Sequence, residues 1–196
     1  MTVEVRGGKM DKKFRAVFWE KLEELKIDWN GKSVIDIGGI GGPLSLLRSP
    51  ELKGANLSCL NLSEQPRNRD FTFIKGNANE MKMILDDTYD LVFCNAMLEH
   101  DKFFWKSVAE MKRILKPGGL LMIGVPGYTK DENPPLNFLQ NVTFTFRFHM
   151  KKDYYRFSPQ AIEEVFFEGF NQIEVISVLR PPRILGMGFK PLEEKN

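Results

Sequence analysis

Residues 33–42 read SVIDIGGIGG, a short apolar run that leads into four glycines within five positions. An apolar run of this length, followed by turn residues, is typical of a strand buried on both faces of a sheet. Glycines after such a strand allow backbone amides to approach a ligand closely. A tight turn alone does not require so many glycines. The stretch therefore predicts an α/β protein with a ligand site at the carboxyl end of this strand.

The same kind of strand recurs along the chain. Four more apolar runs predict strands: ANLSCLNLS (55–63), FTFIKGN (71–77), YDLVFCNA (89–96) and GLLMIGVP (119–126). Helical patterns lie between them, and the clearest places Phe104, Val108, Met111 and Leu115 on one face before a Lys-Pro-Gly-Gly stop. Only residues 63–70, interrupted by a proline, separate two of the strands, so that crossover must be short. Repeated β-α units predict a Rossmann-like, doubly wound, mostly parallel sheet with helices on both faces.

The amino-terminal part of the chain predicts a helix before the first strand. Apolar residues recur at helical spacing behind Asp11, a candidate N-cap, so we expect the helix at about residues 11–26. This N-terminal helix falls within residues 1–30 of what we expect to be a single domain over residues 1–196.

The carboxyl-terminal part predicts one helix and two strands. The helix lies in SPQAIEEVFFEGF, where Ser158 is a candidate N-cap and Gly169 a candidate end. The runs IEVISVL (173–179) and ILGMGF (184–189) flank a segment with two prolines. We expect these two runs to form an antiparallel strand pair that closes the sheet.

Between Pro126 and Tyr155 the regular pattern breaks into a long stretch rich in Pro, Asn and Phe. Long loops inside a compact domain are usually functional or mobile, so we interpret residues 126–157 as a lid or substrate-side insertion. Three phenylalanines in it alternate with polar residues, which places their rings on one face of an extended segment. A small strand or flap that covers the core explains the same alternation.

Composition excludes several classes of partner. The chain has 28 Lys and Arg against 26 Asp and Glu, a net charge of +2, so we expect neither nucleic acid nor anionic membrane as partner. Cys59 and Cys94 lie inside apolar runs without metal-ligand spacing, which indicates buried reduced thiols and no metal site. The charged start and the lack of a long apolar stretch add to the expectation of a cytoplasmic location.

The glycine turn and several later motifs resemble those of the class I S-adenosylmethionine-dependent methyltransferases. VIDIGGIGG is similar to that family's acid-x-Gly-x-Gly-x-Gly turn, and the most specific match is YDLVFCNAMLEHD followed by EMKRILKPGGLLMIGVP. LNLSE and FIKGNANEM resemble the segments on the ribose and adenine sides. DYYRFSPQAIEEVFFEGF is similar to the carboxyl-terminal helix of small-molecule members. The resemblance implies methyl transfer from S-adenosylmethionine to an oxygen or nitrogen of a small molecule, with sugar-like or anionic acceptors as candidates.

The resemblance also assigns roles to individual residues. Those implied to bind the cofactor are Asp36, Gly38, Gly39 and Gly41 around the methionine portion, Asn61 and Leu62 at the ribose, Asn77 and Ala78 at the adenine, and Asn95 at the sulfonium.

The substrate side carries two further hypotheses. His100, just after the fourth core strand, is a candidate general base, and a structural histidine is an equal alternative. The candidate substrate-binding residues are His149, Tyr154, Tyr155 and Arg156, whose alternative role is a solvated hinge.

Two other functions stay open at this point. Ile40, Asn61 and Asn77 stand where the family has a glycine and two acids, which favours a non-catalytic or degenerate cofactor-binding protein of the same fold. An NAD(P)-dependent oxidoreductase is the third hypothesis. It would require G-x-G-x-x-G, and neither register of the glycine turn supplies that pattern.

Overall fold

A seven-stranded sheet with the strand order β3-β2-β1-β4-β5-β7-β6 forms the centre of the computed structural model. The structure describes residues 10–39, 42, 45–63, 70–127, 153–179 and 182–192. The strands are β1 Ser33–Ile37, β2 Asn56–Asn61, β3 Thr72–Lys75, β4 Tyr89–Asn95, β5 Leu115–Pro126, β6 Asn171–Leu179 and β7 Pro182–Phe189. β1 to β5 are parallel, while β7 pairs antiparallel with both β5 and β6. The predicted fold class, including the closing antiparallel pair, is confirmed.

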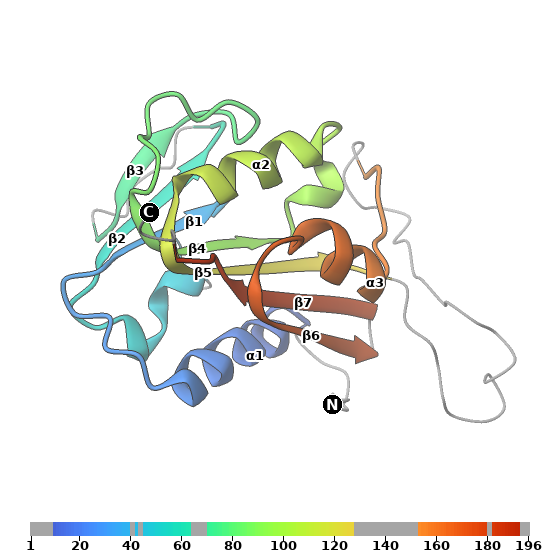
Figure 1. Cartoon of the computed structure of the whole chain (residues 1–196), viewed down its shortest axis with the longest axis horizontal. Helices are drawn as coiled ribbons and strands as arrows, with labels where there is room; N and C mark the ends of the chain where they lie inside the picture. The colour runs from blue at the N-terminus through green and yellow to red at the C-terminus, as the bar shows by residue number, and fades with distance from the viewer. Residues whose placement is uncertain are drawn as a thin grey trace, which may run out of the picture.

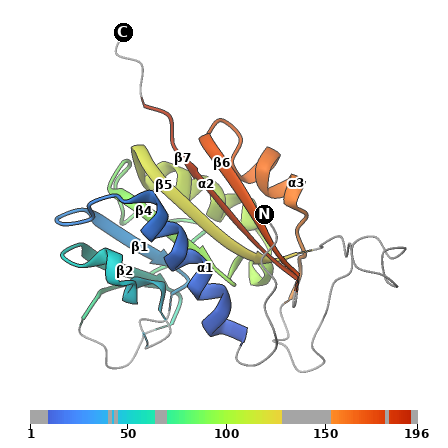
Figure 2. The ribbon, with the colours of Figure 1, turned by 90° about the horizontal axis from the view of Figure 1, so that it is seen from below.

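Helices cover both faces of this sheet, as Figure 1 shows. The helix α1 (Met10–Leu25) packs on one face, and α2 (Phe104–Ile114) lies on the other with the carboxyl-terminal helical segment. Seen from below in Figure 2, α1 crosses in front of the strands. Among the described residues, no helix is both long and apolar enough to cross a bilayer.

Two apolar cores result from the alternation of side chains along the strands. In β4, Leu91 and Phe93 belong to the core under α1, whereas Val92 and Cys94 belong to the core under α2. The two cysteines divide in the same way, and Cys59 lies in the α1 core. Both are buried free thiols, as their apolar context predicted.

The crossovers are less helical than a regular β-α repeat. The described residues between β1 and β2 form two short 3-10 helices, η1 (Leu46–Arg48) and η2 (Pro50–Leu52). The thirteen residues from 76 to 88, between β3 and β4, form turns without a helix. The predicted alternation of strands with helical patterns was therefore too regular for these two crossovers. The buried Leu46, Leu47 and Leu52 still cover their face of the sheet, so the core closes without a long helix.

One predicted boundary was wrong by a small amount, whereas the helix expected at about residues 11–26 is confirmed as α1 (Met10–Leu25). Leu115 is the first residue of β5, where it pairs with Tyr89, and is not the last residue of α2. The Lys-Pro-Gly-Gly segment is thus an irregular start to β5, which accounts for the register shift that precedes Leu91.

The carboxyl-terminal helix begins as expected and then widens. Ser158 caps it, because the Ala161 amide donates to the Ser158 hydroxyl over 3.0 Å. After the α-helical α3 (Pro159–Ala161), residues of η5 (Ile162–Phe166) adopt π-helical geometry. The widened turn brings Ile162, Phe166 and Phe167 into the same core, where all three are buried. π-bulges of this kind accommodate an extra residue inside a helix.

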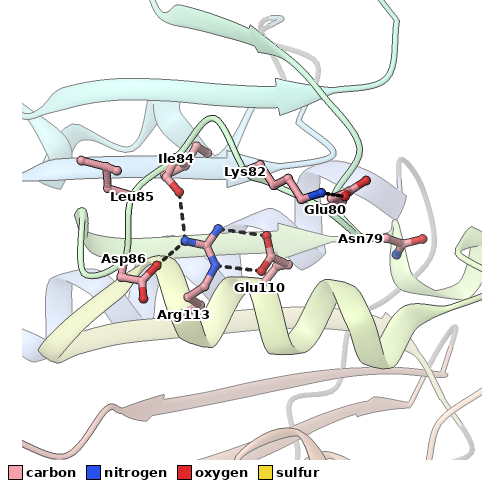
Figure 3. A pocket seen from close by; sticks show the side chains of 8 residues that line it. All are labelled: Asn79, Glu80, Lys82, Ile84, Leu85, Asp86, Glu110 and Arg113. Carbon is pink, nitrogen blue, oxygen red and sulfur yellow. Dashed lines mark hydrogen bonds and ion pairs between the residues drawn. The ribbon is translucent and has the colours of Figure 1, made fainter.

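Arg113 of α2 fastens the helix-free loop between β3 and β4. Its guanidinium donates to the backbone carbonyls of Ile84 at 2.9 Å and Met81 at 3.1 Å, and it pairs with Asp86 at 2.6 Å and Glu110 at 2.8 Å. Glu110 in turn accepts the Met81 amide at 2.5 Å. Figure 3 shows the guanidinium between the loop and the helix. Arg113, Glu110 and Asp86 line one part of a pocket of about 370 Å³.

Arg113→Met is expected to destabilise the fold, because it leaves two backbone carbonyls and two carboxylates without their shared donor. A lost hydrogen bond to a charged group costs roughly 1.5 to 3 kcal/mol, so Tm should fall by roughly 3 to 12 °C in a thermal unfolding scan. Lys82→Met is the matched control, since Lys82 pairs with Glu80 on the open surface of the same pocket. Equal Tm values for both variants would contradict a fastening role for Arg113.

Candidate functional site

A cavity of about 460 Å³ opens at the carboxyl ends of β1 to β4. Ligands of open α/β sheets bind at this edge, and cofactor pockets typically measure ~300 to 1,000 Å³. The site residues named from the sequence that line it are Gly38, Asn61, Leu62, Asn77, Ala78, His100 and Tyr154. The other described ones, which stand behind or beside its wall, are Asp36, Gly39, Asn95, Tyr155 and Arg156. Gly41 and His149 lie outside the described residues, as do Ile40 and most of the expected lid.

The glycine turn after β1 forms the floor of this cavity. Gly38 has a φ of +81°, and a Cβ at this position would lie 2.7 Å from Cγ of Met97. A Cβ on Gly39 would lie 2.5 Å from Oδ2 of Asp36. Both contacts are closer than carbon atoms tolerate, so only glycine lets the β1 turn approach its neighbours. The turn leaves backbone, instead of side chains, facing the ligand space.

Asp36 is a buried carboxylate beneath that turn, only 5% exposed. Burial raises its pKa from 3.8 to about 7, because the apolar surroundings disfavour the charged form. A cationic group next to this carboxylate would offset the free-energy penalty of burying its negative charge. The arrangement fits the ammonium group of an amino-acid-like ligand, which the methionine portion of S-adenosylmethionine carries.

Asn61, at the end of β2, braces the glycine turn. Its side-chain amide donates to the carbonyl of Gly38 at 3.1 Å and to that of Gly39 at 3.2 Å. A carboxylate has no hydrogen to donate, so an acid at position 61 could form neither bond. The amide that departs from the family pattern therefore has a physical reason in this chain. Within the described part of the chain, its oxygen accepts a long 3.4 Å bond from the Ser63 amide.

The loop after β3 forms the adjoining wall. The Asn77 side-chain oxygen accepts the Asn79 amide at 3.0 Å, an arrangement that shapes the turn around the buried Ala78. Asn79 then donates to Asp101 at 2.6 Å and to Ser107 at 2.8 Å, which ties this loop to the start of α2. Asn79 and Asp101 line the cavity and were missed from the sequence, although both stand inside the family-like motifs.

Asn95 ends β4 with its side chain directed toward α1 and not into the cavity. A Cβ on Gly124 of β5 would lie 2.6 Å from Oδ1 of Asn95 and 2.7 Å from the Phe14 ring. That Oδ1 atom is buried and has no hydrogen-bond partner among the described residues. The next residue, Ala96, has a φ of +53°, a rare conformation for a residue with a side chain. Strain of this kind is concentrated at functional sites.

Glu99 and His100 follow in the short 3-10 helix η3 (Leu98–His100). His100 lines the cavity, whereas Glu99 is only 2% exposed. The His100 Nε2 atom lies 3.9 Å from Oε1 of Glu99. Burial raises the pKa of Glu99, and the nearby Asp153 adds to the rise. Sequence reasoning selected His100 and passed over Glu99, since burial of an acidic side chain leaves no local pattern.

Residues 153–157 form the crossing segment, which contributes Tyr154 to the cavity wall. The amides of Tyr154 and Tyr155 donate to the Glu99 carbonyl at 2.7 and 3.4 Å, which anchors this segment to η3. Tyr154 lines the cavity and is 48% exposed. The Tyr155 hydroxyl donates to the Lys102 carbonyl at 2.9 Å. Arg156 forms a mostly buried ion pair with Asp153, so its guanidinium serves the segment itself.

Known proteins resemble the chain in the regions that build this cavity. Residues 36–123, from the glycine turn through most of β5, match the family described as "Methyltransferase domain". A ubiquinone biosynthesis O-methyltransferase of Dechloromonas aromatica (strain RCB) is 26% identical over an alignment that covers 89% of this chain and 78% of that protein.

Two solved structures share the fold at low sequence identity. The Burkholderia thailandensis 1,6-didemethyltoxoflavin-N1-methyltransferase, with bound 1,6-didemethyltoxoflavin and S-adenosylhomocysteine, has a TM-score of 0.62. It is 17% identical, with 92% of this chain and 78% of that chain covered. A SAM-dependent methyltransferase from Aquifex aeolicus has a TM-score of 0.60 and 17% identity, with 92% and 95% covered.

The strand order, the glycine turn above a buried acid and the family match across them agree with one another. The residues present also fit the cofactor, since no described cationic side chain offsets the burial of Asp36 and the turn exposes backbone to the cavity. Residues 36–123 therefore form a methyltransferase domain, and the described part of the chain has the fold of the S-adenosylmethionine-dependent methyltransferases.

Proposed function

We propose that this methyltransferase acts on an oxygen or nitrogen of a small molecule. The observation that carries the proposal is the cavity itself, to which the residue 153–157 segment contributes Tyr154. A cavity of about 460 Å³ has the size of a small-molecule site, and a net charge of +2 does not favour a polyanionic substrate. An O-methyltransferase relative and an N-methyltransferase of the same fold support this class of acceptor.

Each wall of the cavity has a role in this proposal. Asp36 would receive the cofactor's ammonium group, the Gly38 and Gly39 backbone would lie against its methionine portion, and Ala78 would border its adenine. The cofactor supplies an electrophilic methyl group on a sulfonium. Methyl transfer depends mainly on alignment and on exclusion of water, so the residues around it need to position the acceptor more than to activate it.

The acceptor side is formed by residues after β4 and by the crossing segment. His100 faces the cavity, where it is placed either as a base or as a structural donor. Tyr154 offers an exposed ring and hydroxyl at the cavity wall. Tyr155 and Arg156 support that wall from behind, through Lys102 and Asp153. A sugar-like or anionic acceptor, which the sequence favoured, remains the narrower hypothesis.

Thermal unfolding with S-adenosylhomocysteine tests the cofactor half of the proposal. At 100 times its dissociation constant the ligand should stabilise the folded protein by about 2.7 kcal/mol, which raises Tm by roughly 5 to 10 °C. NAD at the same concentration is the control and should not shift Tm. A response to NAD alone would instead favour an oxidoreductase. A response to S-adenosylhomocysteine without methylation of any small acceptor would favour a protein that only binds the cofactor.

A further inference from the structure

The Glu99 carboxylate has an oxygen that no described residue satisfies. Glu99 is 2% exposed, and its Oε2 atom is buried without a hydrogen-bond partner among the described residues. Buried polar side-chain atoms almost always have such a partner, and an exception calls for an explanation. A buried hydrogen-bond acceptor without a donor destabilises the folded protein, and a ligand that supplies the donor relieves this destabilisation.

Glu99 adjoins two residues of the cavity wall. His100, the next residue in the chain, and Tyr154, whose amide donates to the Glu99 carbonyl, both line the cavity. Three ionisable groups lie near the carboxylate: His100 on the same turn, Arg183 at the start of β7, and Asp153 on the crossing segment. Asp153 is already paired with Arg156. Arg183 stands over the Phe14 ring, 5.5 Å from its centroid.

We propose that Glu99 binds the methyl acceptor, with Oε2 accepting a hydrogen bond from the hydroxyl or amine that is methylated. The inference rests on the proposed small-molecule function and deepens it, because it assigns the acceptor a donor group that points to Glu99. It also gives the two polar residues of η3 different roles on the acceptor side. His100 lines the cavity, while Glu99 accepts the hydrogen bond of the group that is methylated.

The same contact gives Glu99 a chemical role. As the acceptor oxygen or nitrogen forms its bond to the methyl carbon, the carbon–sulfur bond breaks and its electron pair stays on sulfur. The acceptor then has one proton too many, and Glu99 takes this proton on Oε2. A carboxylate whose pKa is raised by burial is better suited to this transfer than an ordinary one, because its affinity for the proton is higher.

Glu99→Gln keeps the size of the side chain and removes its ability to take a proton. With tritium-labelled S-adenosylmethionine and either catechol or ethanolamine as the probe, turnover is expected to fall 100-fold or more. S-adenosylhomocysteine affinity, measured by calorimetry, should stay within twofold of the wild type. Wild-type turnover should decrease as the pH falls through the raised pKa of Glu99, and this decrease should be absent from the variant. Glu20→Gln, on the exposed face of α1, is the matched control and should retain wild-type turnover.

A merely structural Glu99 would behave differently in an assay that needs no acceptor. Glu99→Met replaces the unsatisfied carboxylate with an apolar chain of similar length, and its Tm should equal or exceed that of the wild type. A Tm several degrees lower would overturn the proposal. Full turnover in Glu99→Gln would overturn it as well.

Failure of the proposed function gives a different result from failure of this inference. A wild-type protein that does not bind S-adenosylhomocysteine contradicts the proposed function, whatever the variants do. If the wild type binds S-adenosylhomocysteine but methylates neither probe, the Tm of Glu99→Met decides. A Tm equal to or above that of the wild type supports the proposal that Oε2 of Glu99 awaits a ligand, and a Tm several degrees lower contradicts it.

Discussion

Lowering the pH from 8 to 5 is expected to stabilise the ligand-free protein through Asp36. Its pKa is about 7 in the folded protein, against the ordinary value of 3.8 for an exposed aspartate. Between those two values the folded state binds a proton that the unfolded state releases, so stability falls as pH rises through this window. The contribution is complete below pH ~4 and absent above pH ~7. At about 1.4 kcal/mol per unit, the two units from pH 7 to pH 5 amount to roughly 3 kcal/mol.

Urea unfolding of the wild type and of Asp36→Asn at pH 5, 6, 7 and 8 isolates this contribution. The amide cannot titrate, so the variant should lack the Asp36 part of the pH dependence and should be the more stable protein at pH 8. Other groups act in the opposite direction, since ion pairs lower the pKa values of Asp90 and Glu110. Subtracting the free energy of unfolding of the variant from that of the wild type cancels the contribution of Asp90 and Glu110. A difference that is the same at all four pH values would contradict the assignment to Asp36.

Gly38→Ala is expected to cost both stability and cofactor affinity. The φ of +81° is unfavourable for alanine by roughly 1 to 2 kcal/mol, and the new methyl group would press on Met97. To relieve that contact the turn must move into the cavity. We expect at least a tenfold loss of S-adenosylhomocysteine affinity by calorimetry, equivalent to about 1.4 kcal/mol, together with a lower Tm.

Gly169→Ala is a control that separates the effect of backbone strain from the effect of a steric clash at Cβ. Gly169 has a nearly equal φ of +79°, but a Cβ there would meet no atom within 4 Å. This control should lose stability through backbone strain alone and keep its cofactor affinity. If Gly38→Ala loses no more affinity than Gly169→Ala, the cofactor does not depend on the close approach of the β1 turn.

The sheet was predictable from the sequence because strands that are buried on both faces consist of short runs of consecutive apolar residues. The antiparallel pair was predictable for the same reason. The crossovers were not, since Leu46, Leu47 and Leu52 cover the sheet from 3-10 turns and give no helical period. The widened turn of η5 was also invisible, because the residues from 158 to 170 fit an ordinary helix equally well.

Within the site, the glycine turn could be located from its residues alone. The contacts that the neighbouring side chains make could not be predicted. Asn61 donates to backbone carbonyls 22 and 23 residues away. Because every residue has such a carbonyl, no sequence pattern marks these two as the partners. The position of Glu99 depends on amides from the segment 55 residues further along the chain, which no local pattern connects to it. The assigned cofactor and acceptor residues remain predictions for the experiments above.

The two hydrogen bonds from Asn61 make positions 38, 39 and 61 a coupled set. Restoring the acid of related methyltransferases at position 61 alone would place a negative charge against two carbonyl oxygens, where the chain now has a donor. The same substitution could be beneficial only after the turn itself had changed. A change at position 61 is therefore expected to be compatible with the fold only when the glycine turn changes in a compensating way.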